Sequence, residues 1–110
     1  MSGYKSAFPD YGVMDVNIPE GFEDVSYHND SVPSFIQKQP DGTYLRLGVD
    51  YADRSKSEFA HIEPYNRFSL THEDHEHSQI SILAHESDFS VMLDFIDSWK
   101  ASRKNKIRPR

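Results

Sequence analysis

The chain has 110 residues, which is enough for one compact domain with a single core. Hydrophobic residues make up 36% of the sequence and aromatic residues 13%, so we expect a small aromatic-rich core beneath a very polar surface. The lack of cysteine excludes disulfides, thiolate nucleophiles and cysteine-ligated zinc, and no apolar run is long enough to span a membrane. With no secretory signal pattern at its start, the chain is predicted to be a soluble cytoplasmic protein.

The charge is unevenly distributed along the chain. The formal net charge is −6 at pH 7, but five of the twelve basic residues lie in the last eight positions. Residues 1–102 therefore carry 7 basic against 18 acidic side chains, a net charge of −11. Such a field opposes nucleic-acid binding and favours association with a basic protein surface. The basic tail, residues 103–110, is the one segment suited to nucleic acid or an acidic partner, and we interpret it as a solvated end to the preceding helix.

The N-terminal residues 1–22 contain scattered apolar side chains without a sustained period. We interpret this segment as an irregular arm that packs on a single domain over residues 23–102, and we expect a short strand at residues 13–18 within the arm. A further strand is predicted over residues 22–27, where it ends at the turn-forming residues 28–31.

The clearest strand pattern lies on either side of residues 40–42, whose Pro-Asp-Gly sequence is typical of a hairpin turn. Before the turn, residues 34–38 lie between two prolines and predict a short strand. After the turn, apolar side chains alternate with polar ones at Leu45, Leu47, Val49 and Tyr51. This period of two predicts a strand with one buried face, so Arg46 is expected on the exposed face.

The next segments are a loop and two strands. The polar residues 52–66 predict a surface loop, and residues 67–71 return to an extended pattern. Alternation resumes over residues 79–85, which predicts a strand whose core face carries Ile80, Ile82 and Ala84. An alternative interpretation makes residues 71–74 a capping box that starts a helix ending near His85, but the β-branched alternation favours the strand.

The last element is predicted to be a helix from Asp88 to about Ser102, with Ser87 or Asp88 at its N-cap. Apolar side chains recur every three or four residues and form one stripe: Phe89, Met92, Leu93, Ile96 and Trp99. We expect this stripe to cover the core with Trp99 largely buried, whereas Phe95, off its centre, either widens the buried face or contacts a partner. Together the elements predict an α+β fold, a small antiparallel sheet of about four strands with the C-terminal helix packed on one face.

The one dense group of chemically active side chains is the run His72-Glu73-Asp74-His75-Glu76-His77, followed by His85. In an extended chain His75, His77 and His85 share a face, and imidazoles two residues apart can share zinc or another divalent transition metal. The spacing is one residue too short for the H-E-x-x-H motif, which excludes that class of metalloprotease. We expect a solvated hairpin tip and keep metal binding by His72, His75, His77 and His85 as the alternative.

The remaining sequence has neither a G-x-S-x-G nucleophile elbow nor a glycine-rich phosphate loop. We therefore predict a protein that binds a protein partner, as an inhibitor, an immunity-type protein or an adaptor, without catalysis or a cofactor. Tyr44, Arg46 and Phe95 are the candidate contact residues, because tyrosine and arginine are favoured at binding hot spots and Phe95 lies off the helix stripe. Two alternatives stay open: a metal-dependent enzyme that uses the histidines, and an enzyme whose site comes from distant residues. Pairing of a free sheet edge with a second copy would give a homodimer.

Overall fold

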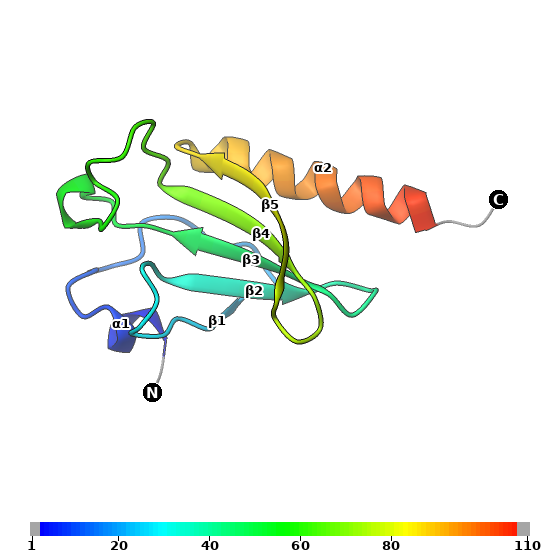
Figure 1. Ribbon diagram of the computed structural model, residues 1–110, viewed down its shortest axis with the longest axis horizontal. Coiled ribbons are helices and arrows are strands. Elements are labelled where there is room, and N and C mark those ends of the chain that lie inside the picture. The colour runs from blue at the N-terminus through cyan, green and yellow to red at the C-terminus, as the bar shows by residue number, and fades with distance from the viewer. Residues whose placement is uncertain (1–2, 108–110) are drawn as a thin grey trace.

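The computed structural model describes residues 3–107, with side chains up to Arg103, and has an α+β fold (Figure 1). Five strands form one antiparallel sheet in the order β1-β2-β3-β4-β5, so each strand pairs with the next along the chain. The elements are α1 (Tyr4–Ala7), β1 (Glu23–Asp24), β2 (Ser34–Lys38), β3 (Tyr44–Val49), a 3-10 helix (Arg54–Lys56), β4 (Phe68–Glu73), β5 (Gln79–Glu86) and α2 (Phe89–Ile107). The predicted fold class is confirmed, with one strand more than the four expected.

β2 and β3 form the hairpin that the sequence predicts. The turn residue Gly42 has a φ of 89°, a conformation that residues with a Cβ rarely adopt. On β3, Leu45, Leu47 and Val49 are all 0% exposed, as the alternation predicts. The other buried members of this core are Phe35, Phe68, Leu70, Met92 and Ile96. The core therefore lies between one face of the sheet and α2.

β5 is a strand, so the alternative helix over this segment is wrong; the predicted core facing holds for Ala84 but is wrong for Ile80 and Ile82. Ile80 and Ile82 are 53% and 56% exposed, although the alternation predicts both on the core face. The pairing of β4 with β5 contains two register shifts, and one of them explains the facing of Ile82. Ala84 lies opposite Leu70 and Ile82 opposite Thr71, so one extra residue between them shifts the alternation. Ala84 packs against the core while Ile82 projects from the other face.

α2 covers the core as predicted. Met92 and Ile96 are 0% and 2% exposed, and Phe89 and Phe95 are half-buried beside them. The helix continues to Ile107, beyond the end that the sequence predicts. Although α2 has 19 residues, no helix in the described part of the chain is long and apolar enough to cross a membrane.

Trp99 is partly buried and packs against the core cluster, beside the fully buried Met92 and Ile96. Its ring meets the imidazole of His72 edge to face, with centroids 5.0 Å apart, and the Arg103 guanidinium lies 4.7 Å above its centre. Arg103 also forms an ion pair with Asp41 in the β2–β3 turn. The first residue of the predicted tail therefore contacts the sheet, whereas residues 108–110 of that tail lie outside the described residues.

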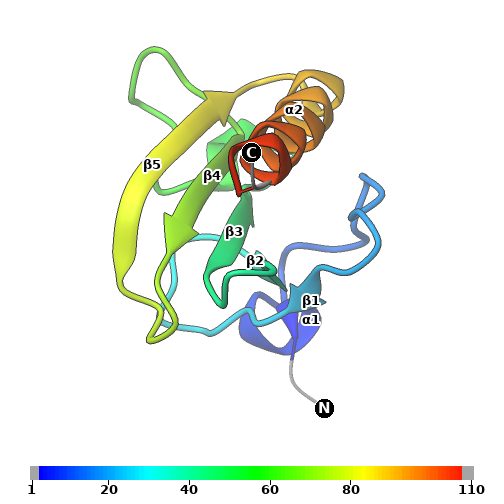
Figure 2. The ribbon, with the colours of Figure 1, turned by 90° about the vertical axis from the view of Figure 1, so that its right-hand side faces the viewer.

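Residues 3–22, which we call the arm, contain α1; residues 13–18 are irregular, so the expected strand there is wrong. The backbone N–H of Met14 donates to the hydroxyl of Tyr4 at 3.2 Å and not to a neighbouring strand. The arm side chains that pack against the core are Tyr4, Tyr11, Met14, Val16, Ile18 and Phe22. The arm and α2 lie on the same side of the sheet (Figure 2).

Candidate functional site

One face of the sheet is left open, because α2 and the arm cover the other face. Residues paired across neighbouring strands project from the same face of a sheet. The side chains in the cross-strand pairs of Ser34, Arg46 and Tyr44 therefore project away from α2. The side chains in the pairs of Leu45 and Leu47 project toward it. We call this surface the open face; its side chains are Ser34, Ile36, Lys38, Tyr44, Arg46, Ser69, Thr71, Glu73, Gln79, Ile82 and His85.

Two adjoining depressions, each of about 480 Å³, lie on the open face. The first, which we call the polar groove, has among its lining residues Tyr27, Asp30, Ser34, Arg46, Thr71 and Glu73. The second, which we call the apolar pocket, is lined chiefly by Val32, Phe59, Ile62, Pro64 and Tyr65, with Asp50, Arg67 and His85. The residues that line both are Ser31, Val32 and Ser69. The two hollows are therefore neighbours that share part of their walls.

Arg46 in the polar groove is held by two partners. Its Nε donates to Oε2 of Glu73 at 2.6 Å, and its Nη1 donates to Oγ of Ser34 at 3.0 Å. The Glu73 side chain is only 8% exposed and the Arg46 side chain 29%, so this ion pair is partly shielded from water. The imidazole Nδ1 of His77 lies 3.2 Å from the second Glu73 oxygen. The opposite charges of Arg46 and Glu73 therefore neutralise each other within the polar groove.

Tyr44 and Arg46, two of the three predicted contact residues, lie together on the open face. The Tyr44 ring packs on the His77 imidazole, with centroids 4.4 Å apart and planes inclined by 34°. Phe95, the third predicted residue, lies on α2 across the sheet and is half-buried against the core. It therefore widens the buried stripe and does not join the other two.

The four histidines of the metal alternative are dispersed. His72 lies on the covered face with its Nε2 2.8 Å from a threonine hydroxyl, and burial lowers the pKa of its imidazole. His75 and His77 lie in the β4–β5 turn, while His85 is the penultimate residue of β5. The extended chain on which the shared face was predicted does not reach His75 and His77, which lie in the turn; His77 packs on Tyr44, and His85 is on the open face. Within the described part of the chain, no three His, Asp or Glu side chains form a group that could hold a metal ion.

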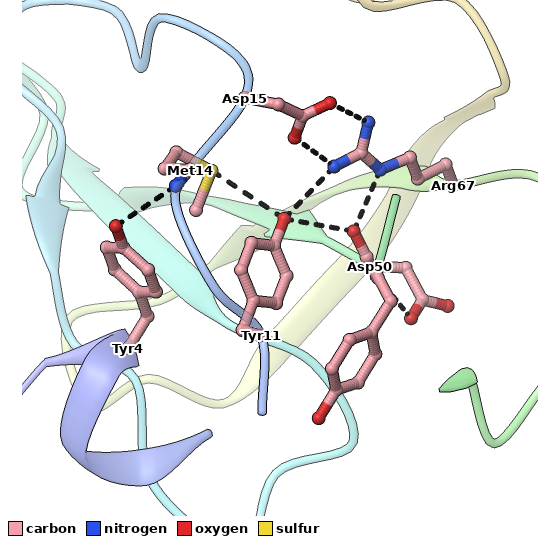
Figure 3. Close-up of polar contacts among 7 residues, drawn as sticks. Tyr4, Tyr11, Met14, Asp15, Asp50 and Arg67 are labelled. Atoms are coloured by element: carbon pink, nitrogen blue, oxygen red, sulfur yellow. Dashed lines mark hydrogen bonds and ion pairs between the residues drawn. The ribbon is translucent and has the colours of Figure 1, made fainter. Parts of the chain in front are cut away.

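A second polar network ties the arm to the strands beside the apolar pocket (Figure 3). Asp15 and Arg67 form a bidentate ion pair, in which Nη1 donates to Oδ2 at 2.8 Å. The same guanidinium donates through Nη2 to the Tyr11 hydroxyl at 3.1 Å and through Nε to the carbonyl oxygen of Asp50 at 2.8 Å. The Tyr11 hydroxyl also donates to this carbonyl at 3.1 Å. Arg67 therefore connects the arm to the ends of β3 and β4 through all three of its nitrogens.

The ionisation of this network follows from pairing and burial. Hydrogen bonds from Arg67 hold the pKa of Asp15 below its usual value, and the same pairing raises the pKa of Arg67. Burial raises the pKa of Tyr11, and burial together with the 2.8 Å hydrogen bond to Asp10 raises the pKa of Tyr51 to about 12. At neutral pH the phenols are therefore protonated beside one paired anion and one paired cation. The ion pair and hydrogen bonds of this network hold the arm against the strands, and we call the network the clamp.

Asp15→Asn should lower the stability at pH 7 by about 1 kcal/mol, because the Asp15 side chain is 45% exposed and solvent weakens its ion pair. A lowered folded-state pKa means that the stabilisation is complete above the unfolded value of about 3.9 and is lost as the pH falls through the folded value. The difference in Tm between the variant and wild type, about 4–8 °C at pH 7, should therefore shrink toward pH 2. Asp97→Asn, at an exposed carboxylate of α2, is the control. An equal difference at both pH values would contradict this role of Asp15.

The sequence pattern does not reveal the clamp or the apolar pocket. Asp15 and Arg67 are 52 positions apart, and the pocket is formed by residues 31–32, 50, 59–69 and 85, so no local spacing relates them. The one signal in the sequence is that no Lys or Arg follows Arg67 until Lys100, which isolates this cation among acidic residues.

Comparison of the chain with protein-family models, with curated proteins and with solved structures finds no match. An antiparallel sheet with one covering helix hosts many unrelated activities. The fold alone therefore assigns no function to this chain.

Proposed function

We propose that this protein acts by binding a protein partner through the open face. The observation that carries the proposal is the gathering of apolar side chains around the two depressions. Of the seven large hydrophobic side chains that are exposed among the described residues, Tyr27, Phe59 and Ile62 line the depressions, and Ile82 projects from the same face. Exposed apolar groups beside shaped hollows are typical of interaction surfaces.

The charge of the chain indicates the kind of partner. Residues 1–102 carry a net charge of −11, and the two arginines that line the depressions, Arg46 and Arg67, are each neutralised by an ion pair. A basic protein surface would be attracted to this body at long range, which speeds its association. An inhibitor, immunity-type or adaptor role in the cytoplasm is consistent with these features.

Photo-crosslinking from the open face tests the proposal. With p-benzoylphenylalanine in place of Tyr44, the chain is expected to capture a discrete protein in the cells that make it; with the same group at Ser98, on the exposed side of α2, it is not. Ile82→Lys should reduce the capture at least tenfold, which corresponds to about 1.4 kcal/mol of binding free energy. Val91→Lys on α2 is the matched control, because Val91 is 44% exposed and Ile82 56%.

Two results would overturn the proposal. The first is equal capture from the Tyr44 and Ser98 positions, and the second is capture from Tyr44 that Ile82→Lys leaves unchanged. If the captured protein is a second copy of this chain, the open face is a homodimer interface and the basic partner is excluded.

A further inference from the structure

We propose that an extended segment of the protein partner pairs with the outer edge of β5 and adds a further strand to the sheet. This segment carries apolar side chains in its middle and a lysine or arginine at each end. The inference rests on the proposed function, because β5 borders the open face and its Ile82 projects from that face. Strand addition to a free sheet edge is a recurring mode of peptide recognition, in which backbone hydrogen bonds supply much of the affinity.

The two edges of the sheet differ in how they are protected against such pairing. Proteins commonly keep an edge strand short or charged, because its outward N–H and C=O groups can pair with another chain. β1, at one edge, has only two residues, and both are acidic. β5, at the other edge, has eight residues, contains no proline or lysine, and has its one carboxylate at its last residue, Glu86 (Figure 2). β5 is therefore the edge that is suited to pairing.

The backbone of β5 has a hydrogen-bonding partner on one side only. β4 is its one neighbour in the sheet, and within residues 3–107 the backbone of residues 79–86 makes no backbone hydrogen bond outside that pairing. No residue of β5 is buried, whereas β2, β3 and β4 each contain buried residues. Ile80 and Ile82 are more than half exposed, so a strand beside β5 would also remove apolar surface from water.

The register shifts between β4 and β5 favour a short partner segment over a second β5. Ile80 and Leu83 have no partner on β4, so β5 carries an extra residue at each of these positions. Such bulges increase the twist of an edge and oppose its pairing with a long regular strand. A short flexible segment can follow this twist. A second β5 would bring two bulges of its own that have to match those of the first.

The charges at the two ends of β5 also favour a basic segment over a second copy of this chain. Acidic residues lie at both ends of the strand: Asp74 and Glu76 in the turn before it, and Glu86 and Asp88 at its other end. Among the described side chains, none of these four pairs with lysine or arginine. Two copies paired along β5 would bring acidic ends together in either orientation, which is unfavourable. A lysine or arginine at each end of a partner segment would meet opposite charge.

The test is an NMR titration of the ¹⁵N-labelled full chain with the capped heptapeptide Lys-Thr-Val-Thr-Val-Thr-Lys. We expect this basic peptide to shift the amide resonances of residues 79–86 and to slow the hydrogen exchange of the amides that point outward, because these gain hydrogen-bond partners. The control peptide has the same sequence with N-methyl groups on the central threonine and both valines. These groups remove backbone donors on both edges of the peptide, so it should bind at least tenfold more weakly.

The charge preference is tested with the acidic peptide Glu-Thr-Val-Thr-Val-Thr-Glu. At low salt it should bind at least fivefold more weakly than the basic peptide, and the ratio should approach one at high salt. Glu76→Lys with Glu86→Lys should reverse the preference. Asp94→Lys with Asp97→Lys, at two exposed carboxylates of α2, makes the same change in net charge and is the matched control, which should still prefer the basic peptide.

Three results would overturn the proposal. Strand addition is refuted if the N-methylated peptide binds as tightly as the unmodified one, or if the shifted resonances lie outside β5. The basic segment is refuted if the acidic peptide binds equally well, or if both double variants lose the preference alike. Sedimentation of the chain alone should give a monomer at the concentration of the titration, and a dimer with protected β5 amides would make a second copy the occupant of this edge.

The titration and the crosslinking experiment fail separately. If the chain is crosslinked to a partner from Tyr44 but the basic peptide does not bind to β5, the open face remains an interaction surface and strand addition is refuted. If the peptide adds to β5 but no protein is captured from Tyr44, the proposed function is refuted, and the edge of β5 is left as a site for extended basic peptides.

Discussion

Arg46→Ala should lower the free energy of unfolding by about 3 kcal/mol, a value at the lower end for breaking a shielded ion pair. The substitution leaves the Glu73 carboxylate, 8% exposed, with the half-exposed His77 as its nearest ionic partner. It also removes the hydrogen bond that the guanidinium donates to Ser34. Urea unfolding of the variant and of wild type at pH 7 measures the difference.

The double variant Arg46→Ala with Glu73→Gln is the matched control for this effect. It removes the unpaired Glu73 charge as well as the Arg46 guanidinium, so it should recover part of the stability that the single variant loses. A loss below about 1 kcal/mol for Arg46→Ala, as for an exposed surface pair, would contradict a shielded charge pair. Because Arg46 stabilises the fold, its role in partner contact has to be judged through neighbours such as Ile82.

Met92→Ala should lower the free energy of unfolding by about 2–5 kcal/mol, since it leaves a cavity where α2 meets the sheet. Met92 is 0% exposed and packs in the same cluster as Leu70 and Phe68. Val91→Ala, at the adjacent position but 44% exposed, should cost less than about 1 kcal/mol and serves as the control for helix propensity. Chemical denaturation of the two variants compares them, and equal losses would contradict the orientation of α2.

The elements with a short-range signal were predictable, and β2 is the clearest case. Prolines on both sides and a Pro-Asp-Gly turn define it, and the structure has the same bounds, residues 34–38. The α2 stripe was predictable in the same way, because spacing alone selects the buried side of a helix. β5 was predictable as a strand but not in its facing, since the register shifts depend on how it pairs with β4.

The candidate site was predictable only where one strand determines it. The alternation along β3 places Tyr44 and Arg46 on one face, and the structure agrees. The partner of Arg46, Glu73, belongs to the histidine-rich run that the sequence presents as a solvated tip, yet it is the last residue of β4 and is buried. The apolar pocket combines loop residues with His85 of β5, and such a combination depends on tertiary packing that no spacing encodes.

The strand order also has a consequence for how the chain folds. Because every strand pairs with its neighbour in sequence, the longest connection that a β-pairing closes is residues 50–67 between β3 and β4, and such local contacts form rapidly. The arm is the exception, since its ion pair from Asp15 to Arg67 closes a loop of 52 positions. We expect the sheet to assemble first and the arm to dock after the rate-limiting step. Loss of the Asp15 carboxylate should then accelerate unfolding and leave the refolding rate unchanged, and slower refolding would indicate that the arm takes part in the transition state.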